Sequence, residues 1–281
     1  MAKLCDGRAA CVASASHLPR DYRLQPSQYF TLIDTLARFH LKAEARRFGL
    51  GYLWWILEPM LYVGVFYLVF VLFLGNRQPD FLVFLAVGKL AFIWFSKSVN
   101  QAALSLVNSR EVMGQTNLPK HLFPVAVMHE GVYRQAAVFA FLLVLVLTLG
   151  YAPTSAWVWL IPVVVAQYLL ILACGLGAAV LVCLQRDFQM LIQLGMVFLL
   201  FISGVFWDIS TLTNPTAVFW LEALNPLAVL LDSYRQILLS GRAPDSGQLV
   251  LIGFQSTALI GIMMWLYRRL HFWLAERAIA Q

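Results

Sequence analysis

The sequence predicts an all-α integral membrane protein with six transmembrane helices, an amphipathic interface helix before the first span and a re-entrant helical hairpin between spans five and six. Hydrophobic residues make up 61% of the chain and charged residues 12%, and the mean hydropathy is +0.75. Soluble domains carry roughly 25% charged residues, so a soluble fold is excluded. Apolar runs of about 20 residues without alternation are long enough for a helix to cross a bilayer with its backbone amides satisfied.

Six apolar runs are expected to cross the membrane. Their predicted bounds are Leu53–Leu74, Phe81–Leu106, Val132–Tyr151, Trp157–Leu184, Met190–Phe206 and Leu249–Tyr267. Two runs carry charged side chains: the second contains Lys89 and Lys97, and the third begins close to His129, Glu130 and Arg134. Long basic side chains near the ends of a span can reach the interface while their stems stay in the apolar region.

The distribution of basic residues predicts that both ends of the chain lie in the cytoplasm. Eight lie before the first span, six more lie in later segments on the same side, and three lie on the opposite side. They are Lys3, Arg8, Arg20, Arg23, Arg38, Lys42, Arg46 and Arg47; Arg110, Lys120, Arg186, Arg268, Arg269 and Arg277; and Arg77, Arg235 and Arg242. Cytoplasmic loops are enriched in such residues, which also supports an even number of spans. Residues 1–26 lack a long apolar core, so we expect a cytoplasmic tail there and one transmembrane domain over residues 27–281.

Residues 27–48 have the pattern of an amphipathic helix that lies on the membrane surface. At 100° per residue, one arc of about 120° contains the polar positions, and apolar residues occupy the rest. The polar positions are Thr31, Asp34, Thr35, Arg38, Lys42 and Arg46. Two interpretations remain open: a simple interfacial anchor for the first span, or a basic stripe that docks a cytoplasmic partner.

The apolar stretch from Phe219 to Leu239 is interrupted at Asn225-Pro226. Asn225 is a good N-cap and Pro226 a good first helical residue, so two short helices are predicted to meet there. Each is too short to cross the membrane. On the outer side this pattern indicates a re-entrant hairpin in which Asp232 and Arg235 can pair, or an amphipathic hairpin resting on the outer surface.

Motifs for catalysis are absent from the sequence. The nearest fragment to a phosphate-binding loop, Gly88-Lys89-Leu90, lies in an apolar span and lacks both the leading glycine and the hydroxyl. The scattered polar residues do not form a mutually supporting acid, base and nucleophile, and the four cysteines lack metal-ligand spacing. The polar residues considered are His129, Glu130, Asp208 and Asp232. We therefore predict no catalytic residues, no metal and no cofactor in this chain.

Aromatic residues, 14% of the chain, gather in three places, and polar residues follow the second cluster. The clusters are Tyr52, Trp54 and Trp55; Phe92, Trp94 and Phe95; and Phe206 and Trp207; the polar residues are Ser96, Ser98, Asn100, Gln101 and Ser105. Interfacial belts explain many of these rings. A translocation path for sugars would use the same residue types, because pyranose faces stack on rings. The polar strip then faces either a lumen or a neighbouring helix, since polar groups in lipid are costly.

Residues 46–59, Arg-Arg-Phe-Gly-Leu-Gly-Tyr-Leu-Trp-Trp-Ile-Leu-Glu-Pro, closely resemble the entry to the first span in the permease subunits of ATP-binding-cassette (ABC) exporters for capsular and O-antigen polysaccharides. Further matches follow in family order and extend over nearly everything from residue 30 onward. They are Phe92-Ile93-Trp94-Phe95-Ser96, Asn117-Leu118-Pro119, Arg186-Asp187, Asn225-Pro226-Leu227 and Tyr234-Arg235. The first 26 residues have no clear counterpart in the family.

The resemblance implies a homodimeric half-transporter of the bacterial inner membrane that exports a lipid-linked polysaccharide to the periplasm. ATP and Mg²⁺ would be bound by two copies of a separate ATPase subunit. The residues implied to couple to that ATPase are Arg38, Lys42, Arg46, Asn117, Leu118 and Pro119. The channel or substrate residues are Tyr52, Trp55, Phe92, Trp94, Phe95, Ser96, Phe206 and Trp207, and the periplasmic hairpin includes Asn225, Pro226, Asp232 and Arg235. Other cargoes of the same architecture, namely teichoic acid, a glycolipid or a drug, stay open, as does a membrane enzyme acting on a lipid-linked sugar.

Overall fold

The protein is all-helical over the residues that the structure, a computed structural model, describes: 26–47, 49–73, 75, 80–115, 118–211 and 213–280. The predicted cytoplasmic tail lies almost entirely outside these residues. The α-helices are α2 (Pro26–Arg47), α3 (Trp54–Tyr67), α4 (Phe81–Asn108), α5 (Arg110–Gln115), α6 (Leu122–Thr148), α7 (Leu160–Leu184), α8 (Phe188–Ile202), α9 (Pro215–Leu224), α10 (Pro226–Leu238), α11 (Ser246–Arg269) and α12 (His271–Ala280).

Within the described residues, five helical segments are long and apolar enough to cross a membrane. They are Gly51–Val71, Phe81–Asn108, Leu122–Thr148, Ser155–Leu184 and Ser246–Arg269. The first joins a short 3₁₀ turn, α3 and a π-helical segment, Leu68–Phe73. The helix at the predicted fifth span, α8, is apolar but has 15 residues, because the chain turns at Ser203-Gly204. A sixth crossing therefore stays a prediction.

Helix α6 differs most from its predicted span. It begins at Leu122 instead of close to Val132, and so includes Glu130 and Arg134 within the helix. Both side chains are buried, with 6% and 7% of their surface exposed. Hydropathy alone places such charges at an interface, whereas here they lie inside the bundle because they pair with each other.

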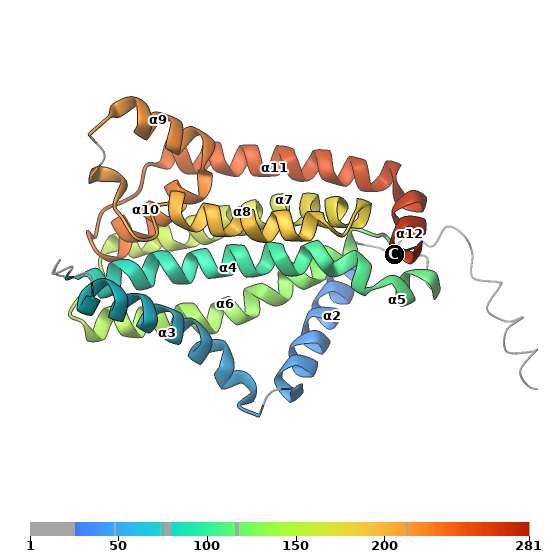
Figure 1. Cartoon of the computed structure of the whole chain (residues 1–281), viewed down its shortest axis with the longest axis horizontal. Coiled ribbons are helices and arrows are strands. Elements are labelled where there is room, and N and C mark those ends of the chain that lie inside the picture. Colours follow the sequence, from blue (N-terminus) through green and yellow to red (C-terminus); the bar gives the residue numbers. More distant parts are fainter. Residues whose placement is uncertain are drawn as a thin grey trace, which may run out of the picture.

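Helix α4 forms the centre of the bundle. It packs against α3, α6, α7, α8 and α10, and most of its side chains are buried. In Figure 1 the long helices α4, α6, α7 and α11 run roughly parallel, with α9 and α10 at one end and α5 and α12 at the other. Small residues allow close packing: a Cβ at Gly131 of α6 would meet the Ser98 hydroxyl of α4 at 2.6 Å.

Helix α2 extends from the edge of the bundle at a steep angle and forms a V with α3 (Figure 1). Its apolar face packs on the beginning of α6, where Ile33 contacts Leu122 and Ala126 in a small buried cluster. Ala37 and Leu41 continue the buried face. The opposite face, with Arg38, Lys42 and Arg46, is exposed. The predicted amphipathic helix is thus present; its position on a membrane surface stays a prediction.

Candidate functional site

A groove of about 590 Å³ runs between α3, α4 and α8. Helix α3 contributes Glu58 and Tyr62, and α8 contributes Gln193 and Met196 along with its apolar neighbours. Helix α4 contributes one stripe at helical spacing: Lys89, Phe92, Ile93, Ser96, Lys97, Asn100, Gln101 and Leu104. Positions three and four residues apart lie on one face of a helix, so the stripe continues along most of α4. The groove combines aromatic rings with charged, amide and hydroxyl side chains along α4, which makes it the candidate site.

The predicted polar strip of α4 divides between two faces. Ser96, Asn100 and Gln101 line the groove, whereas Ser98 faces α6 and Ser105 donates a hydrogen bond to the Ala102 carbonyl at 2.6 Å. The Asn100 amide also donates to the Ser96 carbonyl, at 2.8 Å. Part of the strip therefore faces the groove and part faces protein, and a lumen at the groove stays a prediction.

Aromatic side chains enclose the Lys89 ammonium at one end of the groove. Its Nζ lies 4.6 Å from the centre of the Phe66 ring, 5.8 Å from Tyr62 and Phe92, and 6.0 Å from Phe206. Lys89 is buried, with 6% of its surface exposed. Two of the predicted channel residues, Phe92 and Phe206, thus meet around a lysine that the sequence analysis did not select.

Ser96 also lines the groove, and the remaining predicted channel residues lie outside it. Trp207 donates from its indole to the Phe201 carbonyl at 2.9 Å, and Phe95 is buried in the core. Trp55 and Trp94 line a separate cavity of about 40 Å³ between α3, α4 and α6. Tyr52, which is exposed, packs its ring edge-to-face against Trp55. For these residues a channel role stays a prediction.

Part of the lining of the small cavity is polar. Trp94 Nε1 and Gln135 Nε2 are buried and lack a hydrogen-bond partner within the described part of the chain. A volume of about 40 Å³ is enough for roughly two or three waters, which could satisfy such donors. We therefore assign this cavity to hydration of the bundle interior rather than to cargo.

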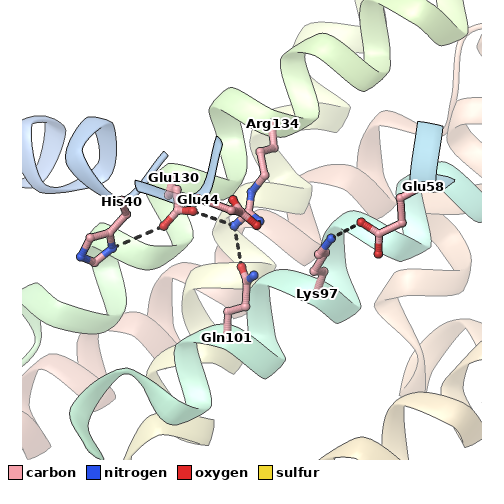
Figure 2. A network of polar contacts seen from close by, with 7 residues as sticks. All are labelled: His40, Glu44, Glu58, Lys97, Gln101, Glu130 and Arg134. Atoms are coloured by element: carbon pink, nitrogen blue, oxygen red, sulfur yellow. Dashed lines mark hydrogen bonds and ion pairs between the residues drawn. The ribbon is translucent and has the colours of Figure 1, made fainter. Parts of the chain in front are cut away.

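A polar network links the surface helix α2 to the groove (Figure 2). Arg134 of α6 is its centre. Its guanidinium contacts Glu130 of the same helix at 3.0 Å and Glu44 of α2 at 3.1 Å, and it donates a hydrogen bond to the side-chain amide oxygen Oε1 of Gln101 of α4 at 2.7 Å. Buried charges are stable only when paired and hydrogen-bonded. The network satisfies Arg134 with two carboxylates and connects three helices.

Two further pairs extend the network at its edges. His40 of α2 lies 3.4 Å from Glu130, and this hydrogen bond raises the pKa of His40. On the other side Lys97 of α4 contacts Glu58 of α3 at 2.6 Å. Figure 2 shows the two pairs on either side of Arg134 and Gln101. Side chains from α2, α6, α4 and α3 thus form a nearly continuous polar path. Sequence reasoning missed Glu44, because a single acidic residue on an amphipathic helix gives no signal of its partner.

The predicted coupling residues lie at the surface of α2 and before α6. Arg38 pairs with Asp34 at 2.9 Å, on the exposed face that also includes Lys42 and Arg46. Leu118 and Pro119 are half-buried just before α6. Asn117 lies outside the described residues, so its predicted role is untested.

The predicted hairpin contains two helices that meet at the predicted residue. Asn225 caps α10 by accepting a hydrogen bond from the Ala228 amide at 3.2 Å, and Pro226 is the first residue of α10, as expected. Asp232 accepts from Gln236, at 2.6 Å, instead of pairing directly with Arg235. Arg235 donates to the main-chain carbonyls of Gly204 and Val205. A sequence does not show which main-chain carbonyls a side chain will contact, so these partners could not be predicted.

Residues 31–239 match the family of ABC-2 type transporters. The chain belongs to the ABC-2 type transporter family. It is 32% identical over 235 residues, which are 83% of this chain and 90% of the relative, to the O-antigen export system permease protein RfbA of Myxococcus xanthus.

Two other ABC-2 relatives have similar coverage. An O-antigen export system permease protein RfbA of Klebsiella pneumoniae is 25% identical, over 75% of this chain and 82% of the relative. The polysialic acid transport protein KpsM of Escherichia coli is 24% identical, over 84% of this chain and 92% of the relative. Membership of a transporter family, together with several apolar helices, identifies this ABC-2 chain as a multi-pass membrane permease.

Proposed function

We propose that the chain is the permease subunit of an ATP-driven exporter that moves a lipid-linked polysaccharide, of the capsule or O-antigen class, from the cytoplasm to the periplasm. The observation that carries the proposal is the similarity, over 83% of the chain, to a protein named as an O-antigen export permease. The groove supports it, because it combines rings for sugar faces with hydroxyl and amide groups for sugar hydroxyls.

In this proposal six helices cross the inner membrane, with both termini in the cytoplasm. Helix α8 and the residues that follow it make the fifth crossing, α2 lies at the cytoplasmic interface, and α9 with α10 forms a re-entrant hairpin on the periplasmic side. The separation of α5 and α12 from α9 and α10 at opposite ends of the bundle is consistent with this orientation (Figure 1). Two copies of the chain face each other across their grooves and form the channel.

The energy source in this proposal is a separate ABC ATPase that binds ATP and Mg²⁺, two copies per permease dimer. Its docking site is the exposed face of α2 together with the segment around residues 117–119. The polar network supports this assignment, since a push on α2 acts directly on Glu44 and His40 and through Arg134 on α4. A shift of the permease then requires that the nucleotide favour one arrangement over another.

Deletion of the gene in the source bacterium tests the transport proposal. The expected result is loss of a surface polysaccharide and its accumulation inside the cell, both reversed by the intact chain supplied in trans. A surface glycan that is unchanged in amount and length after deletion would exclude the proposed cargo.

Charge reversal tests the docking site. We expect the variant with Arg38→Glu, Lys42→Glu and Arg46→Glu to lose co-purification with the cognate ATPase and to lose export. The matched control reverses three exposed cations at the end of α11 and on α12, Arg268, Arg269 and Arg277, and should retain the ATPase. Unchanged ATP turnover and export in the α2 variant would exclude α2 as the docking surface.

A further inference from the structure

Lys89 is the charged group of the groove that has no counter-ion. It lies eight residues into α4, or about 12 Å along the helix from the Phe81 end. Within the described part of the chain its ammonium has no ion pair or hydrogen bond, and four aromatic rings lie around it, of which Phe66 is nearest at 4.6 Å. A buried lysine of this kind is rare in membrane proteins and marks a functional position by default.

The second lysine of the same stripe provides the contrast. Lys97 lies two helical turns further along α4, and Glu58 neutralises it at 2.6 Å. The charged residues that line the groove are Lys89, Lys97 and Glu58, so the groove holds one uncompensated positive charge. That charge belongs to Lys89.

Ring faces attract a cation but do not neutralise it. The negative faces of Tyr62, Phe66 and Phe92 partly replace the water that the ammonium loses on burial. A negatively charged ligand in the groove would be attracted to the Lys89 ammonium more strongly than in water, because the dielectric constant of the site is low. The rings also hold the ammonium in one place, so little side-chain freedom is lost when an anion binds.

We propose that Lys89 is an anion-binding residue of the groove and receives an oxyanion, a phosphate or a carboxylate, carried by the transported molecule. Hydroxyl and amide groups of Ser96 and Gln193 line the same groove and supply neutral donors for the rest of the ligand. The volume of about 590 Å³ is within the range of small-molecule sites and accommodates the anion together with adjacent groups.

This inference rests on the proposed function, since it takes the groove as the path of the cargo. The oxyanion has two sources in a lipid-linked polysaccharide: the phosphate that joins glycan to lipid, and acidic sugars in the glycan. Both would use Lys89 in the same way, so the probes must separate them.

Binding to the purified full chain in phosphatidylcholine nanodiscs tests the site directly. The probes are farnesyl diphosphate, its neutral analogue farnesol, and an oligomer of galacturonic acid. We expect at least one anionic probe to bind, and to bind more tightly than farnesol. Preference for farnesyl diphosphate assigns the site to the lipid-linked phosphate, and preference for the galacturonate oligomer assigns it to acidic sugars. Equal binding of farnesol and farnesyl diphosphate, with no binding of the acidic oligomer, would overturn the proposal.

Two substitutions at Lys89 and one at Glu58, the partner of Lys97, sharpen the test. Lys89→Met should weaken binding of the anionic probe about 10- to 100-fold, the range expected for one charged hydrogen bond, while Lys89→Arg keeps most of the affinity. Glu58→Gln leaves Lys97 uncompensated and should tighten binding. A gain of affinity cannot result from misfolding, so this variant still tests whether the groove binds anions if Lys89→Met does not fold, and Lys89→Arg then tests the residue itself.

The matched control is Arg186→Gln, which removes an exposed cation between α7 and α8 and should leave anion binding unchanged. Anion affinity that is equal in wild type, Lys89→Met and Glu58→Gln would overturn the proposal. Export assays separate this failure from failure of the proposed function. If Lys89→Met exports like wild type while gene deletion abolishes export, the anion site is wrong and the export function stands; if deletion leaves the surface glycan intact, the export function itself is wrong.

Discussion

Two buried arginines, Arg134 and Arg235, have similar exposure, 7% and 6%, but entirely different partners. Arg134 is held by side chains from α2, α4 and α6. Arg235 of α10 is held by main chain: it donates to the Gly204 carbonyl at 2.7 Å and the Val205 carbonyl at 3.0 Å, and its guanidinium stacks on Phe84 at 3.5 Å.

The difference indicates different roles for the two ends of the bundle. Side-chain partners on separate helices can be exchanged when one helix moves, so the Arg134 network is suited to pass a displacement of α2 to α4. Backbone carbonyls at a turn cannot be exchanged without rebuilding the turn, so Arg235 fixes the end of α8 to α10 and α4. We therefore interpret the Arg134 end as a coupling region and the Arg235 end as a fixed frame.

Removing Arg134 should have the largest effect on stability. Arg134→Met leaves Glu44 and Glu130 without their cation and is expected to cost about 3–5 kcal/mol of unfolding free energy, measured by denaturant titration in mixed micelles. Because the partners are side chains, adding Glu44→Met and Glu130→Met should recover most of the loss. A triple variant as unstable as Arg134→Met alone would contradict the paired-charge account, and Arg186→Met is the exposed control.

Removing Arg235 should have a somewhat smaller effect that no second substitution can reverse. Arg235→Met loses the charged hydrogen bonds to the carbonyls of Gly204, Val205 and Phe84, which we expect to cost about 3 kcal/mol in the same titration. Arg235→Lys should recover only part of this, because an ammonium lacks the planar fork that reaches two carbonyls. If substitution of Asp232 restored the unfolding free energy of Arg235→Met, the loss would come from an unpaired Asp232 carboxylate and not from the carbonyls of the turn.

The Lys97–Glu58 pair should contribute less, since 39% and 30% of the two side chains are exposed. A double-mutant cycle of Lys97→Met and Glu58→Gln is expected to give a coupling free energy of about 1 kcal/mol. A coupling near zero would mean that the pair does not connect α3 to the network.

The smallest effect should be a pH dependence of α2 packing. The pKa of His40 is raised by its hydrogen bond to Glu130, so the contact stabilises the folded state most when His40 is protonated. This contribution is fully present below the unfolded-state pKa of about 6.5 and is lost as the pH rises through the higher folded-state pKa. Hydrogen exchange of α2 amides, corrected for intrinsic rates, should therefore speed up across that window. His40→Gln should abolish the change, and an unaltered pH profile in that variant would exclude His40 as its source.

Much of the fold was predictable because lipid imposes strong rules on sequence. The lengths of the apolar runs predicted the bounds of four of the long helices to within a few residues, and the Asn225-Pro226 pair predicted the start of α10. The beginning of α6 was not predictable, because hydropathy treats Glu130 and Arg134 as interfacial when their partners are unknown. Helix α8, at the predicted fifth span, is shorter than the apolar run, because the turn at Gly204 ends the helix.

The candidate site was predictable only in part. Phe92 and Ser96 were selected by residue type and do line the groove, because aromatic and polar residues share one face of α4. Trp94 and Phe95 are the same residue types but lie at positions that helical rotation turns away from it. Lys89, Gln193 and Glu44 depend on which helices meet, and a single sequence does not contain that information.

Photo-crosslinking in cells tests the central claim, that the groove is the path of the glycan. A photoreactive residue replaces Tyr62 in the groove or, as a control, Phe254, which is exposed on the apolar face of α11. The account predicts that Tyr62 captures a glycan-containing species in cells with an active ATPase and that Phe254 captures lipid without glycan. Equal glycan capture at the two positions, or capture at Phe254 alone, would contradict it.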